Sequence, residues 1–248
     1  FSEILSLDDL AWILKNEYAM DIVNNHHVDL LFSKFSPEEI IDKFRGNPTY
    51  APFITQNAGY FADYITSDDL SWLAGNDYAA WDLVQDDTLI WHNLFSLKSM
   101  FSEFRKYDYG ALLVASYPEY FAEYVTSDDF SWLFKDRNSA SDVLREYEPY
   151  CYTLFSLELI FLELQQNNFG AELVSLNPEL FFDYVTTTDL KWLLSSNKST
   201  DAFLIVYELG WNNKYTPTEI IVLLKQLYPN DYENFIEDFN FLQNIEVN

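Results

Sequence analysis

The sequence repeats itself at a fixed interval, and this feature limits the fold more than any other. The segments 60–73, 120–133 and 180–193 read YFADYITSDDLSWL, YFAEYVTSDDFSWL and LFFDYVTTTDLKWL. A fourth copy opens the chain, where Phe1 takes the place of Phe61 and the segment 8–12 matches 68–72. Such a period is typical of chains built from stacked units of secondary structure. We therefore expect four modules, 1–60, 61–120, 121–180 and 181–240, followed by a tail at 241–248.

A weaker repeat at half that interval divides each module and marks the starts of helices. Serine or threonine recurs at Ser6, Ser36, Thr66, Ser96, Thr126, Ser156, Thr186 and Thr216. These hydroxyls suit helix N-caps, because they accept a hydrogen bond from an otherwise unpaired amide of the first turn. An acid follows three residues later except at Ser99 and Leu159, which predicts a capping box in the remaining units. An apolar residue before each cap and another four residues after it predict a hydrophobic staple in every unit.

This pattern predicts an all-α chain, because no alternating run bounded by tight-turn dipeptides indicates a sheet. Each half-module has room for two short helices. Helices this short are stable only when they stack, so we expect an α-solenoid of eight helical hairpins that forms one elongated domain over 1–248. The layout resembles helical repeat arrays of the HEAT or armadillo kind. No signature motif of either is present, so the resemblance implies no functional residue.

The two ends of the chain differ. The segment 231–243 is acidic on one side, with Asp231, Glu233, Glu237 and Asp238, and apolar on the other, with Phe235, Ile236, Phe239 and Leu242. Such a segment suits a C-terminal capping helix, since a terminal repeat otherwise exposes half an interface. The N-terminus has no comparable cap, and we expect a leading segment to be missing there through processing or truncation.

The charge excludes one class of function directly. The chain carries 40 acidic residues against 14 lysines and arginines, a net charge of −26. A protein that binds nucleic acid by charge neutralisation needs a basic surface, so we expect no direct nucleic-acid partner. One cysteine excludes a disulfide framework, and no apolar run approaches the length of a membrane span. We therefore expect a soluble, intracellular protein that binds no membrane.

The sequence carries no signature of a cofactor or metal site. The glycines form neither a phosphate loop nor a dinucleotide turn, so we expect no cofactor, and Gly110 and Gly170 suit close packing instead. The adjacent His26 and His27 point about 100° apart on a helix, which disfavours a metal site. Cys151 lies between two tyrosines and suits a buried, inert thiol.

Pairs of neighbouring carboxylates are the only arrangement that suggests a hydrolase. Asp68 and Asp69 are explained by helix-start chemistry, and their repetition in other copies contrasts with the single pair that glycoside hydrolysis needs. We expect no enzyme. A carboxylate-pair hydrolase remains the weakest alternative.

One constellation points to binding. On a helical wheel, the apolar residue four positions after the cap is set at 0° and each residue turns by about 100°. The apolar residues of the helix then fall within one arc of about 100°, whereas the recurring tryptophan lies at about 200° and the acid four residues before it at about 160°. The residues concerned are Asp8 and Trp12, Asp68 and Trp72, Asp128 and Trp132, and Trp192, which Thr188 precedes. Two interpretations stay open. The tryptophans pack into adjacent units, as large aromatic residues in solenoids commonly do, or they stack on a partner while the acids pair with its arginines or lysines.

We therefore expect a non-enzymatic repeat scaffold whose acidic, aromatic-rich surface binds a basic protein or peptide. The alternative is a nucleic-acid mimic or immunity-type inhibitor that blocks a DNA- or RNA-binding enzyme or a basic toxin. Mimicry depends on acids spread along both edges of the array, beyond the helix starts. Some are offered by Asp82, Asp86, Asp87, Asp142, Glu146, Glu148 and Asp201.

Overall fold

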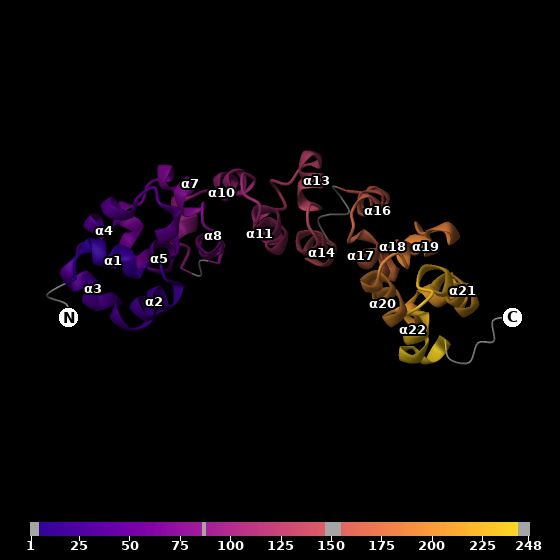
Figure 1. The fold of residues 1–248 in the computed structure, drawn as a ribbon. Coiled ribbons are helices and arrows are strands. Elements are labelled where there is room, and N and C mark those ends of the chain that lie inside the picture. Colours follow the sequence, from indigo (N-terminus) through magenta and orange to yellow (C-terminus); the bar gives the residue numbers. More distant parts are fainter. Residues whose placement is uncertain (1–4, 86–87, 147–154, 243–248) are drawn as a thin grey trace. The chain divides into compact units, whose positions relative to one another are not determined.

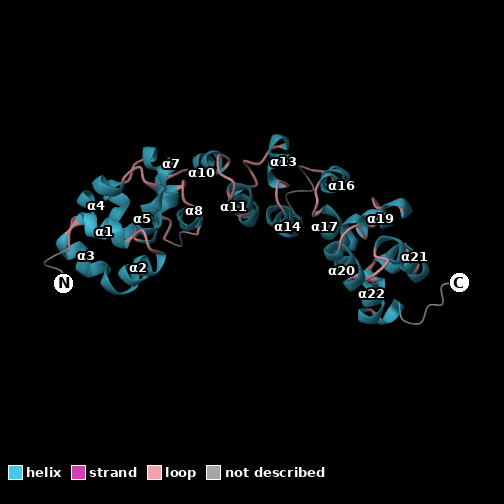
Figure 2. Cartoon of the chain, viewed as in Figure 1, coloured by secondary structure: helices cyan, strands magenta, loops and turns pink. Residues whose placement is uncertain are grey.

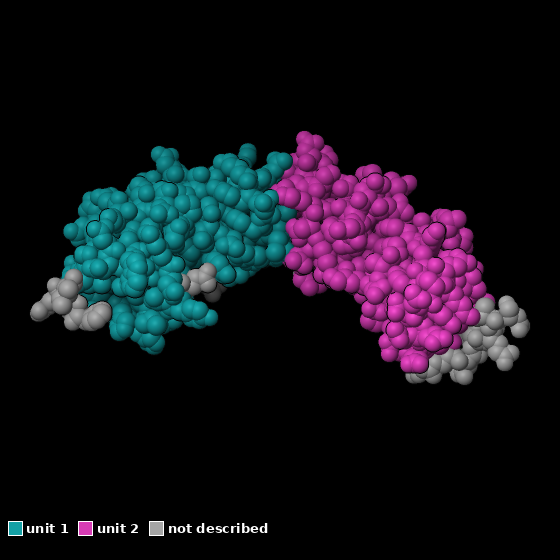
Figure 3. Space-filling model, in the orientation of Figure 1, with its two compact units in different colours: residues 1–125 teal, residues 126–248 magenta. Residues whose placement is uncertain are grey.

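The computed structural model describes residues 5–85, 88–146 and 155–242. Every regular element in these ranges is helical (Figure 2), so the predicted all-α class is confirmed for this part of the chain. The chain divides into two compact units, residues 1–125 and residues 126–248 (Figure 3).

Unit 1 is built from short helices (Figure 1). They are α1 (Leu7–Ile13), α2 (Glu17–Ile22), the π-helix η1 (Val23–His27), α3 (Val28–Lys34), α4 (Pro37–Phe44), η2 (Pro48–Tyr50), α5 (Ala51–Gln56), α6 (Ala58–Phe61), η3 (Ala62–Tyr64), η4 (Ser67–Asp69), α7 (Leu70–Leu73), α8 (Asp77–Val84), α9 (Ile90–Leu94), α10 (Leu97–Phe104), α11 (Gly110–Ser116) and α12 (Pro118–Phe121).

Unit 2 follows the same scheme. Its helices are η5 (Ser127–Asp129), α13 (Phe130–Leu133), α14 (Arg137–Glu146), α16 (Leu157–Gln166), α17 (Gly170–Leu176), α18 (Pro178–Phe181), η6 (Thr187–Asp189), α19 (Leu190–Leu193), α20 (Asn197–Ile205), η7 (Tyr207–Leu209), η8 (Trp211–Asn213), α21 (Pro217–Leu227), α22 (Tyr232–Asp238) and η9 (Asn240–Leu242). Among the described elements, η1 is a π-helix and the other η elements are 3₁₀ turns.

The predicted helix starts are confirmed at all eight positions, because each predicted serine or threonine is the N-cap of a helix. Where an acid was predicted to complete the box, its carboxylate accepts the backbone amide of the cap residue. At Ser96 and Ser156 only the side chain accepts an amide, from Ser99 and Leu159. At Thr66, Thr126 and Thr186 the first turn is a 3₁₀ turn, a common form at helix ends.

The core of each unit contains the same tryptophan contact. Trp91 in unit 1 and Trp211 in unit 2 occupy equivalent positions two modules apart, and both are fully buried. The indole N–H of Trp91 donates to the carbonyl of Thr55 at 3.2 Å, and that of Trp211 donates to the carbonyl of Ser175 at 2.9 Å. Buried indole N–H groups need such a partner. The repeat therefore keeps its register in the core as well as at the helix starts.

One helix pair also recurs in both units. In unit 1, α8 packs against α5, and in unit 2 α20 packs against α17 (Figure 1). The second pair lies two modules after the first in the sequence. Small and apolar side chains of both helices are buried at each contact, and they include Ala51, Phe53, Ile54, Ala79 and Leu83 in unit 1 and Ala171, Leu173, Val174, Ala202 and Phe203 in unit 2.

The two recurring glycines are close-packing positions, as predicted. A Cβ atom on Gly110 would lie 1.9 Å from the carbonyl oxygen of Phe104, and one on Gly170 would lie 1.7 Å from that of Leu164. Both glycines open a second helix, α11 or α17, directly against the end of the preceding helix. Only a residue without a side chain allows the two backbones to approach this closely.

The C-terminal segment is amphipathic as predicted but is not one continuous helix. Helix α22 ends at Asp238, and the 3₁₀ turn η9 follows it. Phe235 and Leu242 are buried, whereas Glu233 and Glu237 are exposed. Residue 243, the predicted end of the helix, lies outside the described ranges.

Within the described part of the chain, no helix combines the length and the apolar composition needed to cross a membrane.

Candidate functional site

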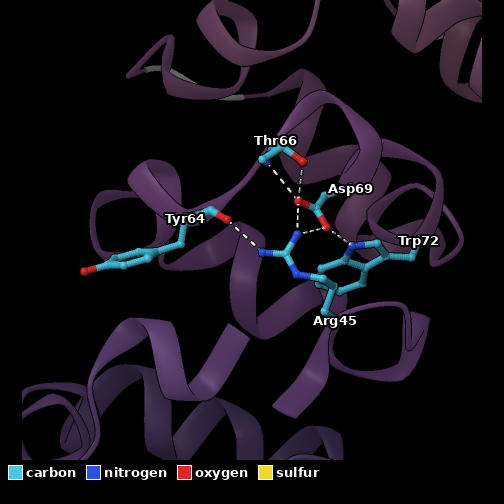
Figure 4. Close-up of polar contacts among 5 residues, drawn as sticks. All are labelled: Arg45, Tyr64, Thr66, Asp69 and Trp72. Atoms are coloured by element: carbon cyan, nitrogen blue, oxygen red, sulfur yellow. Dashed lines mark hydrogen bonds and ion pairs between the residues drawn. The ribbon is translucent and has the colours of Figure 1, made fainter. Parts of the chain in front are cut away.

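A densely connected polar cluster surrounds the capping acid of the second module. Both carboxylate oxygens of Asp69 contact Nη1 of Arg45 (Figure 4). The indole N–H of Trp72 donates to Oδ1 at 2.8 Å, and the backbone amide and hydroxyl of Thr66 donate to Oδ2 at 2.9 and 3.0 Å. The second guanidinium nitrogen of Arg45 donates to the carbonyl of Tyr64 at 2.9 Å. Arg45 thus links the end of helix α4 to the turn that begins the next module.

The surroundings of Asp69 stabilise its charged form. Burial alone would raise the pKa of this carboxyl, but the hydrogen bonds from Trp72, Thr66 and Arg45 outweigh burial and hold its pKa below the ordinary value. Asp69 is almost fully buried, so its charge depends on these donors. The cluster therefore joins the end of α4, in the first module, to η4 and α7 in the second module.

A weaker version of this joint occurs in unit 2. The carboxylate of Asp189 accepts the amide and hydroxyl of Thr186 at 2.6 and 2.7 Å, and Nε2 of Gln165 donates to it at 3.4 Å. Gln165 occupies the register of Arg45, since each precedes its acid by the same interval. Trp192 is partly exposed, and its ring meets that of Phe161 edge-on at 5.9 Å.

The first module presents its tryptophan differently. Trp12 on α1 is 76 % exposed. Asp8, one helical turn earlier on the same helix, is exposed as well and forms an ion pair with Nζ of Lys43 at 2.6 Å. The capping acid Asp9 bonds to Ser6 and is exposed, in contrast to Asp69. Asp8 and Trp12 therefore form an acid and indole pair that solvent reaches.

The seven candidate residues thus occupy different environments. Asp68 and Asp128 are exposed like Asp8, Trp132 and Trp192 are partly exposed, and Trp72 is only 8 % exposed. The indole N–H of Trp72 donates to Asp69, whereas the helical wheel placed Asp68 beside the tryptophan.

Sequence reasoning missed Arg45, which was not among the candidates. Its signal is its spacing to the capping acid Asp69, which Gln165 shares with Asp189. A search for short motifs does not reveal a spacing of this length.

Asp68 lines a shallow recess on unit 1 together with Lys98, Ser99 and Glu103. Glu103 is largely buried, and its carboxylate pairs with Nζ of Lys106 at 2.5 Å. Lys43 in the first module stands in the register of Glu103, so the lysine that neutralises Asp8 has an acid as its counterpart beside Asp68. Lys98 lines the same recess, so Asp68, like Asp8, has a lysine nearby.

Asp82 is an acid whose titration the fold changes strongly. Its carboxylate accepts the hydroxyl of Thr55 at 2.7 Å. Burial raises its pKa from 3.8 to about 6, although hydrogen bonds from Thr55 and Gln56 partly offset this effect. Asp82 lies at a joint between α5 and α8 and is not part of an open acidic row.

The described residues hold no cluster of metal ligands. Within residues 5–85, 88–146 and 155–242, no group of three histidine, cysteine, aspartate or glutamate side chains is arranged to bind a metal ion. The rings of His26 and His27 lie 6.4 Å apart at an angle of 67°. Cys151, Asp86, Asp87 and Glu148 lie outside the described residues.

Comparisons with known proteins give no family assignment. No protein-family model matches the chain, and no curated protein or solved structure matches it.

Proposed function

We propose that this chain is a non-enzymatic repeat scaffold, an α-solenoid of four 60-residue modules with a C-terminal cap, whose acidic and aromatic surface binds a basic protein or peptide. The observation that carries the proposal is the solvent-exposed pair of Asp8 and Trp12 on α1. An indole face attracts a cation. Asp8, one turn away, forms an exposed ion pair with Lys43, and a surface pair of this kind is weak enough for a cation of the partner to replace the lysine.

Three repeated features support the solenoid. The N-caps recur once per half-module, the buried tryptophan contact recurs in both units, and α8 on α5 is repeated by α20 on α17. The tryptophan bond and the helix pair each join a helix to one that stands about half a module earlier in the sequence. Solenoids are built from such nearest-neighbour contacts, because no single unit buries its own apolar face.

The acids at the helix starts that carry the recurring tryptophan divide into two groups, and only one supports binding. The capping acids at Asp9, Asp69, Asp129 and Asp189 bond to their own N-cap residues and are used within the fold. The acids directly before three of them, Asp8, Asp68 and Asp128, take no part in those boxes and are exposed. With a net charge of −26, such a surface attracts basic partners over long range and repels polyanions.

Two of the acids proposed for nucleic-acid mimicry contact side chains of the chain itself. Asp82 is half-buried against Thr55, and Asp142 forms an ion pair with Arg145 at 2.9 Å. Asp201 is exposed, as are other carboxylates away from the helix starts, such as Asp63 and Glu123, so exposure of these acids does not separate a scaffold from a mimic. Mimicry would be indicated if the chain inhibited a DNA-binding enzyme and duplex DNA restored its activity.

The proposal is tested with a fluorescently labelled arginine-rich peptide and the full chain. We expect Trp12→Ala and Asp8→Asn each to weaken binding by about tenfold or more, as for a contact at the centre of an interface. Replacing arginine with lysine in the peptide should weaken binding too, because the planar guanidinium stacks better on indole.

Tyr78→Ala is the matched control, since Tyr78 is also an exposed aromatic residue of unit 1 but does not belong to the candidate surface. Circular dichroism establishes that all variants remain folded. Equal affinities of wild type, Trp12→Ala and Asp8→Asn would refute the proposed surface.

A further inference from the structure

A polar recess lies on unit 1 between α5, α6, α8 and α9, whereas the pair of Asp8 and Trp12 lies on α1. Helices α5 and α8, which pack on each other, form two of its walls (Figure 1). The recess encloses about 460 Å³ and is open to solvent. Its described lining carries one carboxylate, that of Asp82 on α8, together with neutral amides that include Gln56 and Gln85. Concave sites with a small number of polar groups commonly hold a ligand.

The amide groups of the lining donate to other parts of the chain. The amide nitrogen of Asn57 donates to the side chain of Asn24 at 2.9 Å and to the carbonyl of Phe53 at 2.8 Å. The amide nitrogen of Gln85 donates to the hydroxyl of Tyr117. An amide whose nitrogen is engaged in this way offers its oxygen as an acceptor. The lining is therefore rich in hydrogen-bond acceptors.

Asp82 adds a carboxylate to these acceptors. It is half-buried, and its described partners are the hydroxyl of Thr55 at 2.7 Å and the amide of Gln56, both neutral. Burial outweighs these bonds and raises the pKa of Asp82 to about 6, so its charge at neutral pH costs stability. Ala202 stands at the same module position in unit 2, so the repeat does not need an acid there. A charge kept at a cost to stability is typical of functional sites.

One copy of the repeat shows which cation suits this position. In α14, Asp142 takes the module position of Asp82, and Arg145 takes that of Gln85. Nη2 of Arg145 donates to Oδ1 of Asp142 at 2.9 Å. A guanidinium therefore pairs with this acid where the chain supplies one. In unit 1 the neutral Gln85 stands in its place.

We propose that the recess between α5, α6, α8 and α9 binds the guanidinium group of an arginine side chain on a basic partner, with the carboxylate of Asp82 as its counter-charge. A guanidinium has five N–H donors and accepts no hydrogen bond, so it matches a lining of acceptors. An ammonium is more strongly hydrated and suits a half-buried carboxylate less well. The inference rests on the proposed function, since it gives the basic partner a second contact.

The test uses the full chain and the labelled arginine-rich peptide. Asp82→Asn should weaken binding at least about tenfold at about pH 7. The same variant should be more stable than wild type at this pH, because folding favours the neutral form of Asp82. A residue that acts only through the fold would instead lower affinity and stability together. Asp142→Asn is the matched control, because it removes an acid whose cation is already in place, and it should leave affinity unchanged.

A second variant blocks the recess without removing its acid. Gln85→Arg places a guanidinium where Arg145 stands in α14, so it should pair with Asp82 and lower peptide affinity at least about tenfold. Gln85→Ala loses the same bond to Tyr117 but adds no cation, and should weaken binding less. Asn138→Arg adds the same charge at an exposed position of unit 2 and should leave affinity unchanged.

Peptide affinity should also depend on pH through Asp82. Its pKa is about 6, and the ionised carboxylate is the form that attracts a cation. The affinity of wild type should therefore rise about five- to tenfold between about pH 5 and about pH 7. The affinity of Asp82→Asn should stay nearly constant over this range.

The other titratable groups around Asp82 do not account for such a rise. Helix α5 carries none. The tyrosines are Tyr78 on α8, Tyr60 on α6 and Tyr117, and phenols ionise at about pH 10, far above this range. Helix α9 carries His92, whose ring contacts a backbone carbonyl of α8 at 3.1 Å. Because His92 is retained in Asp82→Asn, a pH dependence that persists in this variant would belong to the histidine and would overturn the inference.

Failure of this inference and failure of the proposed surface on α1 give different results. Loss of affinity in Asp82→Asn but not in Trp12→Ala would support the recess and refute the surface on α1. The reverse result would overturn the inference, and so would Gln85→Ala binding as weakly as Gln85→Arg. Free arginine amide should bind at least about tenfold more weakly than the peptide. Equal affinity of the two probes would assign the recess to a small guanidinium compound and overturn its assignment to a partner's side chain.

Discussion

The indole N–H of Trp72 donates to Oδ1 of Asp69 over 2.8 Å. This bond joins the tryptophan that recurs once per module to the acid that closes the capping box of the same helix. In the first module the corresponding Trp12 is exposed. One sequence motif thus serves the interior in one copy and presents a side chain to solvent in another.

The different environments of these two tryptophans predict different effects on stability. Trp72→Ala removes a buried ring and a donor of Asp69, and should lower the free energy of unfolding by about 3–5 kcal/mol. Trp12→Ala should change it by no more than about 0.5 kcal/mol. Urea denaturation followed by circular dichroism measures both. Similar shifts for the two variants would contradict the environments described for Trp12 and Trp72.

The contacts of Arg45 between α4 and η4 predict that substitutions at this position lower stability by different amounts. Arg45→Ala leaves the buried carboxylate of Asp69 without its cation, and should cost about 2–4 kcal/mol. Arg45→Gln should cost less, because Gln165 already serves this role for Asp189. Thermal unfolding at neutral pH ranks the variants. If glutamine is as damaging as alanine, hydrogen bonding at this position does not contribute.

The same joint has a pH signature. The pKa of Asp69 is held below its ordinary value, so its contribution to stability is present above the unfolded pKa and is lost as the pH falls through the folded pKa. Removing the Arg45 cation raises the pKa of Asp69 in the folded protein, so the pH range over which Asp69 contributes to stability becomes narrower. Acid unfolding of Arg45→Ala should therefore occur at a higher pH than that of wild type, which a circular dichroism titration across the range of carboxyl ionisation would show.

The raised pKa of Asp82 predicts that its contribution to stability depends on pH in the opposite direction. Its folded pKa of about 6 exceeds its ordinary value, so folding favours the protonated form, and stability is lost as the pH rises through this window. Asp82→Asn imitates the neutral acid. It should be more stable than wild type at about pH 7 by about 1–2 kcal/mol, allowing for solvent screening, and equal to it near about pH 4. A constant difference at all pH values would show that Asp82 does not titrate in this range.

The sequence predicts local features well for physical reasons. An N-cap requires only that a hydroxyl, an acid and two apolar residues stand at fixed short spacings, as at Ser36 and Glu39. The close approaches at Gly110 and Gly170 were also predictable, since each glycine recurs at a helix start. Spacing within one helical turn determines these contacts.

The orientation of the tryptophans could not be predicted in the same way. The helical wheel assumed about 100° per residue from the cap onward, which holds for α1 from Leu7. Residues Ser67–Asp69 form a 3₁₀ turn of about 120° per residue, so the residues after it are rotated by about 60°. Arg45 lies far before Asp69 in the sequence. A contact at such a separation depends on how the helices of successive half-modules pack against one another.

A buried hydroxyl distinguishes the two units. Thr55 donates to Asp82 at 2.7 Å, but the corresponding Ser175 Oγ has no hydrogen-bond partner among the described residues, because Ala202 stands in the register of Asp82. Ser175→Ala should therefore be neutral or stabilise the chain by up to about 1 kcal/mol, whereas Thr55→Ala should destabilise it at about pH 5 by about 1–3 kcal/mol. Denaturation midpoints at that pH compare the two. Destabilisation by Ser175→Ala would show that its hydroxyl has a partner.

The glycines provide the last prediction, with a control in the same chain. Gly110→Ala places a methyl group 1.9 Å from the carbonyl oxygen of Phe104, which is backbone and cannot rotate away, so α11 must move from α10. We expect a loss of about 2–4 kcal/mol. Gly59 lies in α6 with no atom within 4 Å of its hypothetical Cβ, so Gly59→Ala should raise stability by about 0.5–1 kcal/mol through lower entropy of the unfolded chain. Differential scanning calorimetry should show a lower unfolding temperature for Gly110→Ala and a higher one for Gly59→Ala than for wild type. Equal shifts of the two variants would refute the steric role of Gly110.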